Sequence, residues 1–273
     1  MLDSITNNWD YPVEMQPIFS DTGKKIETHR AVVRTDTSEV LGVHGNSYKI
    51  ITNDDVINSI MDSIKKTGLG TDYKFKAIVT DNGRKMRAEI IYPNETFEPV
   101  VGDIHQFRIN VYNSYDGSWA MQQVSDALRL RCLNGQMFPD VISKTWAKHT
   151  TNVSIDGSAL KIVKGLNTFK NQKEIYQGYM KAKVDRTSVE AFLKMTLCSV
   201  KMKSDAKKYN EKRLESLLGL YDTEASNLGS NKWALYNSLT YWATHTGKLK
   251  SPENARRIRE NEIAKAIPAM AMI

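Results

Sequence analysis

Basic side chains recur at alternate positions around an Asn-Gly pair in the segment YKFKAIVTDNGRKMRAEIIY, residues 73–92. Lys74 and Lys76 precede the pair, and Lys85 and Arg87 follow it. Alternate residues of a strand share one face of a sheet, so these four cations are expected to lie together. Ammonium and guanidinium groups neutralise phosphate oxygens. The segment therefore predicts a hairpin that binds the phosphate backbone of a nucleic acid.

The Asn82-Gly83 pair fixes the expected register of this hairpin, because a type I′ turn needs positive φ at both central residues. One face is then apolar or aromatic, and we expect it to pack on a helix predicted for residues 54–66. Its cross-strand pairs are Val79/Met86, Ala77/Ala88, Phe75/Ile90 and Tyr73/Tyr92. The opposite, mostly polar and basic face has the pairs Thr80/Lys85, Ile78/Arg87, Lys76/Glu89 and Lys74/Ile91.

A further strand is predicted for residues 107–111, where apolar residues alternate with polar ones. If its apolar side faces inward, Arg108 and Tyr112 join the basic face. Tyr112, together with Trp119 beyond the run NSYDGS, supplies aromatic rings that can stack on unpaired bases. The same cations also suit an ordinary solvated face, and Lys76 opposite Glu89 suits a cross-strand ion pair.

Arg129 and Arg131 alternate with leucines in DALRLRCLNGQMF. If the run is extended, both arginines share one face and enlarge the cationic surface. Alternatively, they pair with Asp116 or Asp126 in a structural network.

Motifs for catalysis are missing: the sequence has no GxSxG, no Walker A loop, no GxGxxG and no HExxH. Asp103, Asp116 and Asp126 could converge on Mg²⁺, although their spacing does not require it and Asp116 also suits a turn. We therefore predict no cofactor, no metal and no enzymatic activity, and keep a metal-dependent nucleic-acid-processing enzyme as the alternative.

The chain has 273 residues, a net charge of +7 and two cysteines without metal-ligand spacing. No apolar run approaches the roughly 18 residues of a membrane span, and the start MLDSITNNWDYPVEMQ lacks the features of a signal peptide. These features predict a cytoplasmic protein without a membrane partner, and the basic excess is compatible with an anionic one.

The periodicities predict an α+β fold. We expect an irregular N-terminal arm over residues 1–29, then a sheet-rich core over 30–150 in which a helix backs an antiparallel hairpin meander, then a helical region over 151–273. The predicted short strands are 31–34 and 40–43, and a strand near 119–124 is expected to lead to a helix near 133–137. Helices are predicted for 160–181, 189–200, 207–227 and 232–244.

Several segments resemble the phage/plasmid-related protein family, a domain of unknown function. They are HRAVVRTDTSEVLGVHGNSYKIITNDDV, NSYDGSWAMQQ, LRLRCLNGQMF, KHT at 148–150 and LGSNKWALYNSLTYWATH. This resemblance covers residues 30–245 and implies a setting in replication or recombination. The predicted order of elements is also similar to the core of the ring-forming single-strand annealing proteins of phages. That likeness of topology implies a hairpin sheet and a basic groove that hold single-stranded DNA.

Together these features predict a single-stranded DNA-binding protein, an annealing or recombination factor of a phage or mobile element. It would act as a homo-oligomer, a ring or a filament, in the cytoplasm of a bacterial host. A phage protein that inhibits a host protein is a further alternative. The double substitution Lys85→Glu/Arg87→Glu is expected to leave the fold intact and to abolish DNA binding.

Overall fold

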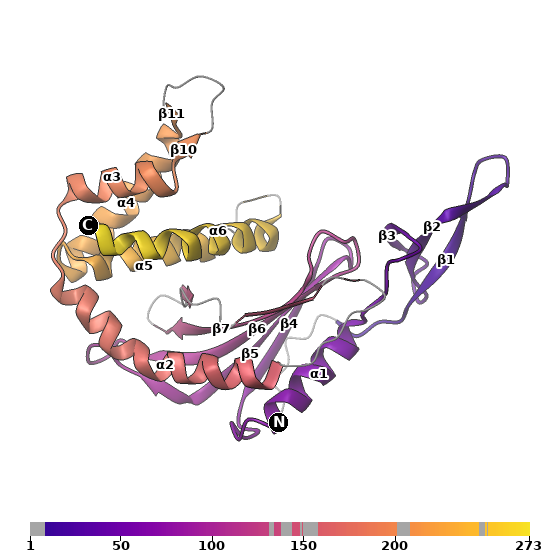
Figure 1. Cartoon of the computed structure of the whole chain (residues 1–273), viewed down its shortest axis with the longest axis horizontal. Coiled ribbons are helices and arrows are strands. Elements are labelled where there is room, and N and C mark those ends of the chain that lie inside the picture. The colour runs from indigo at the N-terminus through magenta and orange to yellow at the C-terminus, as the bar shows by residue number, and fades with distance from the viewer. Residues whose placement is uncertain are drawn as a thin grey trace. The chain divides into compact units, whose positions relative to one another are not determined.

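The computed structural model describes residues 9–130, 134–137, 144–147, 149, 158–200, 208–245, 249 and 251–273 (Figure 1). Antiparallel sheets occupy the N-terminal half and helices dominate the C-terminal half, which confirms the predicted α+β class.

A three-stranded antiparallel sheet comes first in the chain, in the order β1 (Val13–Phe19), β2 (Lys25–Arg34), β3 (Val40–Gly45). Its inner side packs around a core of Tyr11, Val32, Leu41 and Tyr115. The expectation of an irregular arm is therefore wrong for β1 and for the start of β2. The turn residues Asp21, Thr22 and Gly23 between two alternating segments indicate a hairpin, and Gly23 has the positive φ of 77° that this turn requires.

The helix α1 (Asn53–Lys65) begins and ends one residue before the predicted bounds of 54–66. Thr52 is the N-cap, although asparagine is also a common capping residue, and the Thr52 hydroxyl accepts a hydrogen bond from the Asp55 amide in a reciprocal capping box. Asn53 instead uses its side chain to join segments, since it accepts from Asn113 and donates to the Trp9 carbonyl. In the apolar stripe predicted for this helix, Val56, Ile57, Ile60 and Ile64 are buried and Met61 is half-buried.

The large sheet has the strand order β4-β5-β6-β7-β8, and β9 pairs with β7. Its strands are β4 (Lys74–Thr80), β5 (Lys85–Phe97), β6 (His105–Ser114), β7 (Met121–Arg129), β8 (Asn134–Met137) and β9 (Lys144–Ala147). The predicted β4–β5 register is confirmed from Lys74/Ile91 to Thr80/Lys85. Asn82 and Gly83 have φ values of 55° and 86°, as the type I′ turn demands. The helix expected near residues 133–137 is wrong, because β8 extends the sheet beside β7.

The helices are α2 (Ser158–Lys181), α3 (Arg186–Thr196), α4 (Glu211–Leu228), α5 (Lys232–Thr244) and α6 (Pro252–Ala266), followed by the 3₁₀ helix η2 (Ile267–Met272). The expected helix 189–200 ends at Thr196, because β10 (Ser199–Val200) pairs with β11 (Lys208–Tyr209). No helix in the described ranges is long and apolar enough to cross a bilayer.

Two compact units divide the chain. The first comprises Met1–Glu95, Phe107–Asp126 and Ile142–Asn167, and the second comprises Thr96–Gln106, Ala127–Val141 and Thr168–Ile273. The division falls within β5, β6, β7 and α2.

At Gly42 the backbone of β3 passes close to the turn after β6. A Cβ atom at this glycine would lie 2.5 Å from the Tyr115 carbonyl oxygen and 2.6 Å from His44 Nε2. We predict that Gly42→Ala lowers the free energy of unfolding by about 1–3 kcal/mol, since it overpacks a rigid contact. Gly178→Ala in α2 is the control, because its Cβ meets nothing within 4 Å and alanine favours helices. Equal denaturation midpoints for the two variants would contradict this account.

Candidate nucleic-acid interface

The structure separates the predicted nucleic-acid-binding residues into three groups. Lys74 and Lys76 are exposed, and Arg131 lies outside the described residues. The third group is buried, with at most 8% of each residue accessible: Lys85, Arg87, Arg108, Tyr112, Trp119 and Arg129. The expectation that these six residues lie on an open cationic surface is therefore wrong.

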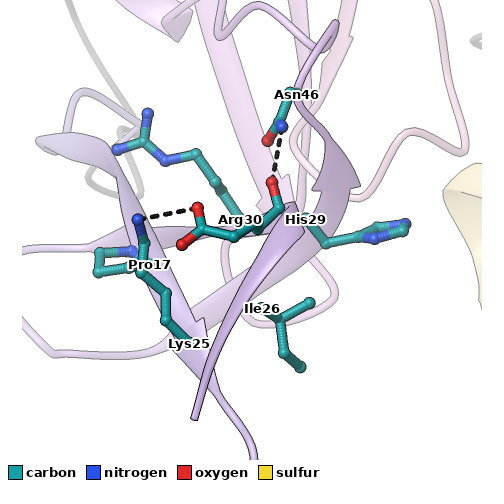
Figure 2. A pocket seen from close by; sticks show the side chains of 7 residues that line it. Pro17, Lys25, Ile26, His29, Arg30 and Asn46 are labelled. Atoms are coloured by element: carbon teal, nitrogen blue, oxygen red, sulfur yellow. Dashed lines mark hydrogen bonds and ion pairs between the residues drawn. The ribbon is translucent and has the colours of Figure 1, made fainter.

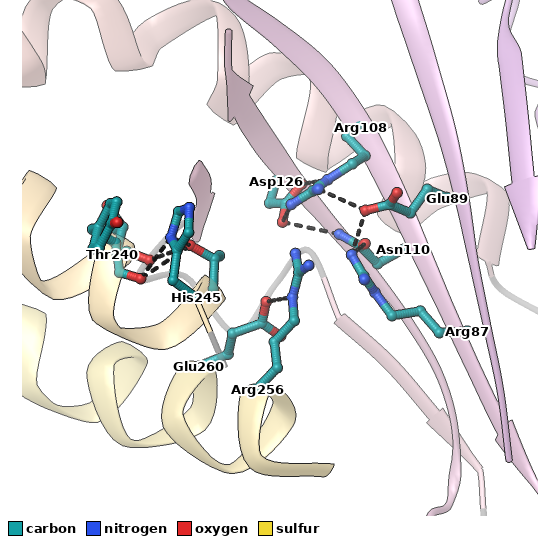
Figure 3. A network of polar contacts seen from close by, with 11 residues as sticks. Arg87, Glu89, Arg108, Asn110, Asp126, Thr240, His245, Arg256 and Glu260 are labelled. Carbon is teal, nitrogen blue, oxygen red and sulfur yellow. Dashed lines mark hydrogen bonds and ion pairs between the residues drawn. The ribbon is translucent and has the colours of Figure 1, made fainter. Parts of the chain in front are cut away.

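The buried arginines of β5 and β6 belong to a polar network on one face of the large sheet (Figure 3). Arg108 donates two hydrogen bonds to Asp126, at 2.8 and 2.7 Å, and a third to Glu89 at 2.8 Å. Arg87 donates to Glu89 and to the side-chain oxygen of Asn110. Asn110 in turn donates to Asp126 at 2.9 Å. These contacts connect β5, β6 and β7 through side chains.

Two guanidinium groups and two carboxylates balance the charge of this network. Burial alone lowers the pKa of Arg108, but the charges of Asp126 and Glu89 outweigh burial and raise it. Withdrawal of either carboxylate would leave a buried cation uncompensated, at a cost of several kcal/mol. Arg87 and Arg108 therefore stabilise the sheet, and a phosphate could reach them only by displacing their partners.

Lys85 and the two predicted stacking aromatics are held near the turn after β6. The Lys85 ammonium contacts Asp81, lies 3.5 Å from Asp116 and is 5.7 Å from the centroid of the Trp119 ring. Tyr112 packs edge-on against Trp119, with ring centroids 5.7 Å apart. Neither ring presents a face to solvent, so neither serves as a stacking platform in this conformation.

Arg129, in the second unit, is also paired. It donates to both oxygens of Asp103, at 2.6 and 3.1 Å, and to the side-chain oxygen of Asn237 at 2.8 Å. Burial raises the pKa of Asp103, but hydrogen bonds from His105 and Arg129 outweigh burial and lower it. Arg129 therefore belongs to a structural network, which was one of the two alternatives from the sequence. Its partner is Asp103 rather than Asp116 or Asp126.

The three aspartates considered as magnesium ligands each meet a different cation: Asp103 meets Arg129, Asp116 meets Lys85 and Asp126 meets Arg108. Burial raises the pKa of Asp116, but hydrogen bonds from Ser118 and the Lys85 charge outweigh burial and lower it. Across the described ranges, no three His, Cys, Asp or Glu side chains are grouped to hold a metal ion.

Lys74 and Lys76 project from β4, the edge strand of the large sheet. In the described part of the chain neither forms an ion pair, because the register partner of Lys76, Glu89, is engaged by Arg87 and Arg108. Edge lysines also prevent strand addition by another chain. These two residues are the predicted cations that remain available to a ligand.

A second exposed cationic region lies on the β1–β2 hairpin, which we call the ribbon. All ten residues from Asp21 to Arg30 are exposed, among them Lys24, Lys25 and Arg30. The β1–β2 register shifts between Pro17 and Ile18. At this irregularity lies a pocket of about 470 Å³ (Figure 2), lined by Pro17, Lys25, Ile26, Glu27, His29, Arg30 and Asn46.

Hydrogen bonds shape this pocket and leave cationic donors for a ligand. Lys25 pairs with Glu27 at 3.0 Å, and Asn46 donates to the Glu27 carbonyl at 2.8 Å. One guanidinium nitrogen of Arg30 donates to the Met15 carbonyl at 2.8 Å. Sequence reasoning missed this site because the prolines within residues 1–28 favoured an irregular backbone. The turn signal at Asp21–Gly23 could have revealed it.

In the first unit, Tyr48 lies between two histidines that are far apart in the sequence. Tyr48 stacks on His44 with ring centroids 3.8 Å apart, and His149 stacks on Tyr48 at 5.2 Å. His44 Nε2 lies 2.7 Å from the Tyr115 carbonyl oxygen, whereas neither ring nitrogen of His149 has a hydrogen-bond partner among the described residues. Burial and the charge of His44 lower the pKa of His149 and outweigh an opposing contribution from the Lys49 backbone. The stack therefore disfavours the charged form of the His149 imidazole.

The profile of a domain of unknown function (DUF932) matches residues 40–265. The chain belongs to this family. No curated protein and no solved structure shows a match to it. The matched range includes the large sheet, Lys74, Lys76 and the histidine stack, whereas β1 and β2 precede it. Membership in DUF932 therefore supplies no activity.

A double-mutant cycle tests the structural role of the Arg108–Asp126 pair. We predict that Arg108→Met alone lowers the free energy of unfolding by about 3–5 kcal/mol, because it leaves a buried carboxylate uncompensated. Arg108→Met/Asp126→Leu should recover part of this loss in chemical denaturation. Additive losses would contradict a coupled pair.

Because Lys85 and Arg87 are also buried and paired with carboxylates, we expect Lys85→Glu/Arg87→Glu to disrupt the fold, in contrast to the expectation from sequence.

His149 predicts a pH dependence of stability. Its pKa in the folded protein lies below the ordinary value of 6.5, so the unfolded chain binds more protons as the pH falls below that value. Stability should therefore decrease on acidification below about pH 6.5 and level off once the folded state is protonated. His149→Phe keeps the stack and should reduce this slope in thermal melts. Exposed His29→Phe is the control, and an unchanged slope in His149→Phe would contradict the assignment.

Proposed function

We propose that this protein binds single-stranded DNA through the exposed cations of its first unit, and acts as an annealing or recombination factor without catalysing a reaction. The observation that carries this proposal is the ribbon, where Lys24, Lys25 and Arg30 are exposed and the last two line a pocket of about 470 Å³. A flexible phosphate backbone can follow such a projecting cationic strand pair. Lys74 and Lys76 on the edge of the large sheet offer further phosphate contacts.

The proposal also concerns the genetic element that encodes the protein and the compartment in which it acts. We place it in a phage, plasmid or other mobile element, acting in the cytoplasm of a bacterial host, on the resemblance described from its sequence segments. Self-association into a ring or filament would align many ribbons along one strand, and bases kept accessible could then pair with a complementary strand. The net charge of +7 supports the encounter with a polyanion.

Salt dependence tests this proposal directly. Binding of a fluorescent oligonucleotide, followed by anisotropy at several salt concentrations with duplex as the comparison, should show affinity for the single strand that falls with log salt. In Lys24→Gln/Lys25→Gln and in Lys74→Gln/Lys76→Gln, the slope of log affinity against log salt should become shallower. The expected change is roughly 0.7 for each phosphate that the variant no longer neutralises.

The matched control is Lys212→Gln, an exposed lysine of α4 in the second unit, which should leave both affinity and slope unchanged. Absence of binding by the native protein at low salt would overturn the proposal and turn attention to a host protein as partner. Native-like slopes in both double variants would overturn the assignment of the cations.

A further inference from the structure

One face of the ribbon combines an exposed aromatic ring with two cations. Phe19 pairs with Lys25 across the two strands, and Pro17 pairs with Arg30. Residues directly opposite each other on antiparallel strands share a face, so Phe19 lies on the same face as Lys25, and Pro17 on the same face as Arg30. Figure 2 shows Lys25 and Arg30 on one side of β2 and Ile26 and His29 on the other. We call this set of four residues the ribbon face.

Phe19 is 57% exposed although it is large and apolar. A single exposed apolar residue is common on protein surfaces, but here the ring lies directly opposite Lys25, and paired side chains on neighbouring strands are about 5 Å apart. We propose that Phe19 stacks on an unpaired base while Lys25 and Arg30 contact the flanking phosphates. This inference rests on the proposed function and names the residue that holds the base.

A second copy of the chain fits the ribbon face less well than a nucleic acid. Pro17 has no backbone N–H to donate, and the irregularity after it interrupts the edge of β1, so strand addition is disfavoured there. Two ribbon faces brought together would also bring their cations together; Glu27 compensates Lys25, whereas no carboxylate of the described residues is paired with Arg30. A polyanion would instead attract the cations of the ribbon face.

A single strand fits better than a duplex because its bases are available for stacking. In a duplex each base is already stacked and paired, and exposing one costs a few kcal/mol. Aromatic stacking tolerates any sequence because every base has a π face. The ribbon face therefore accounts for strand selectivity without base-specific hydrogen bonds. It also replaces the buried Tyr112 and Trp119 as the stacking residue.

The test compares two single strands, one of thymidines and one of the same length with abasic sites, by fluorescence anisotropy at constant salt. Phe19→Ala should weaken binding of the thymidine strand about 5- to 100-fold, the range expected when one base no longer stacks on an aromatic ring. It should change binding of the abasic strand little. Val43→Ala is the matched control, since Val43 is an apolar residue of the same sheet that is 52% exposed.

Phe19→Trp provides a second readout, because its indole fluorescence should be quenched by the thymidine strand and not by the abasic strand. Equal affinities of Phe19→Ala and the native protein for the thymidine strand would overturn the inference. If Lys24→Gln/Lys25→Gln still weakened binding in that case, the proposed function would survive. Loss of a dimer in Phe19→Ala without any DNA present, seen by sedimentation, would assign Phe19 to self-association and also overturn it.

Discussion

A charge removed from water must be compensated, and this constraint determines which cations of the protein can meet a ligand. Arg108 is held by Asp126 and Glu89, Arg129 by Asp103, and Lys85 by Asp81 and Asp116. These pairs lie in the large sheet or beside its turns. Basic residues that the sequence suggests are available to a ligand therefore connect neighbouring strands instead. Of the cations predicted to bind, Lys74 and Lys76 on the edge strand β4 are left to solvent, and the ribbon adds Lys24, Lys25 and Arg30.

The sequence predicted the local geometry of the β4–β5 hairpin well, because a two-residue turn determines the register of the strands that flank it. It also predicted correctly that Arg87 and Arg108 share a face. It could not predict that this face is buried, since alternation shows which side chains lie together and not what covers them. Glu89 and Asp126 were the available signal: acidic residues on the same face as the arginines favour a buried network over a phosphate site.

Long-range contacts account for the rest of what sequence reasoning missed. His44, Tyr48 and His149 form one stack although about a hundred residues separate the two histidines, and no local spacing could reveal it. The strand β8 replaces an expected helix because pairing beside β7 outweighs local preference. The ribbon was missed for a different reason, since its turn residues were recognisable but the nearby prolines suggested irregular backbone. Its position before the range matched by DUF932 makes it a feature to be tested in this chain itself.

Lysine footprinting by limited acetylation and mass spectrometry, with and without bound single-stranded DNA, tests most directly the claim that burial and pairing decide which cations bind. The account predicts that Lys24, Lys25, Lys74 and Lys76 react in the free protein and become protected in the complex. It also predicts that Lys85 reacts poorly in both states. Protection of the exposed lysines of α2, such as Lys164 and Lys173, with no change at the ribbon and β4 would contradict it.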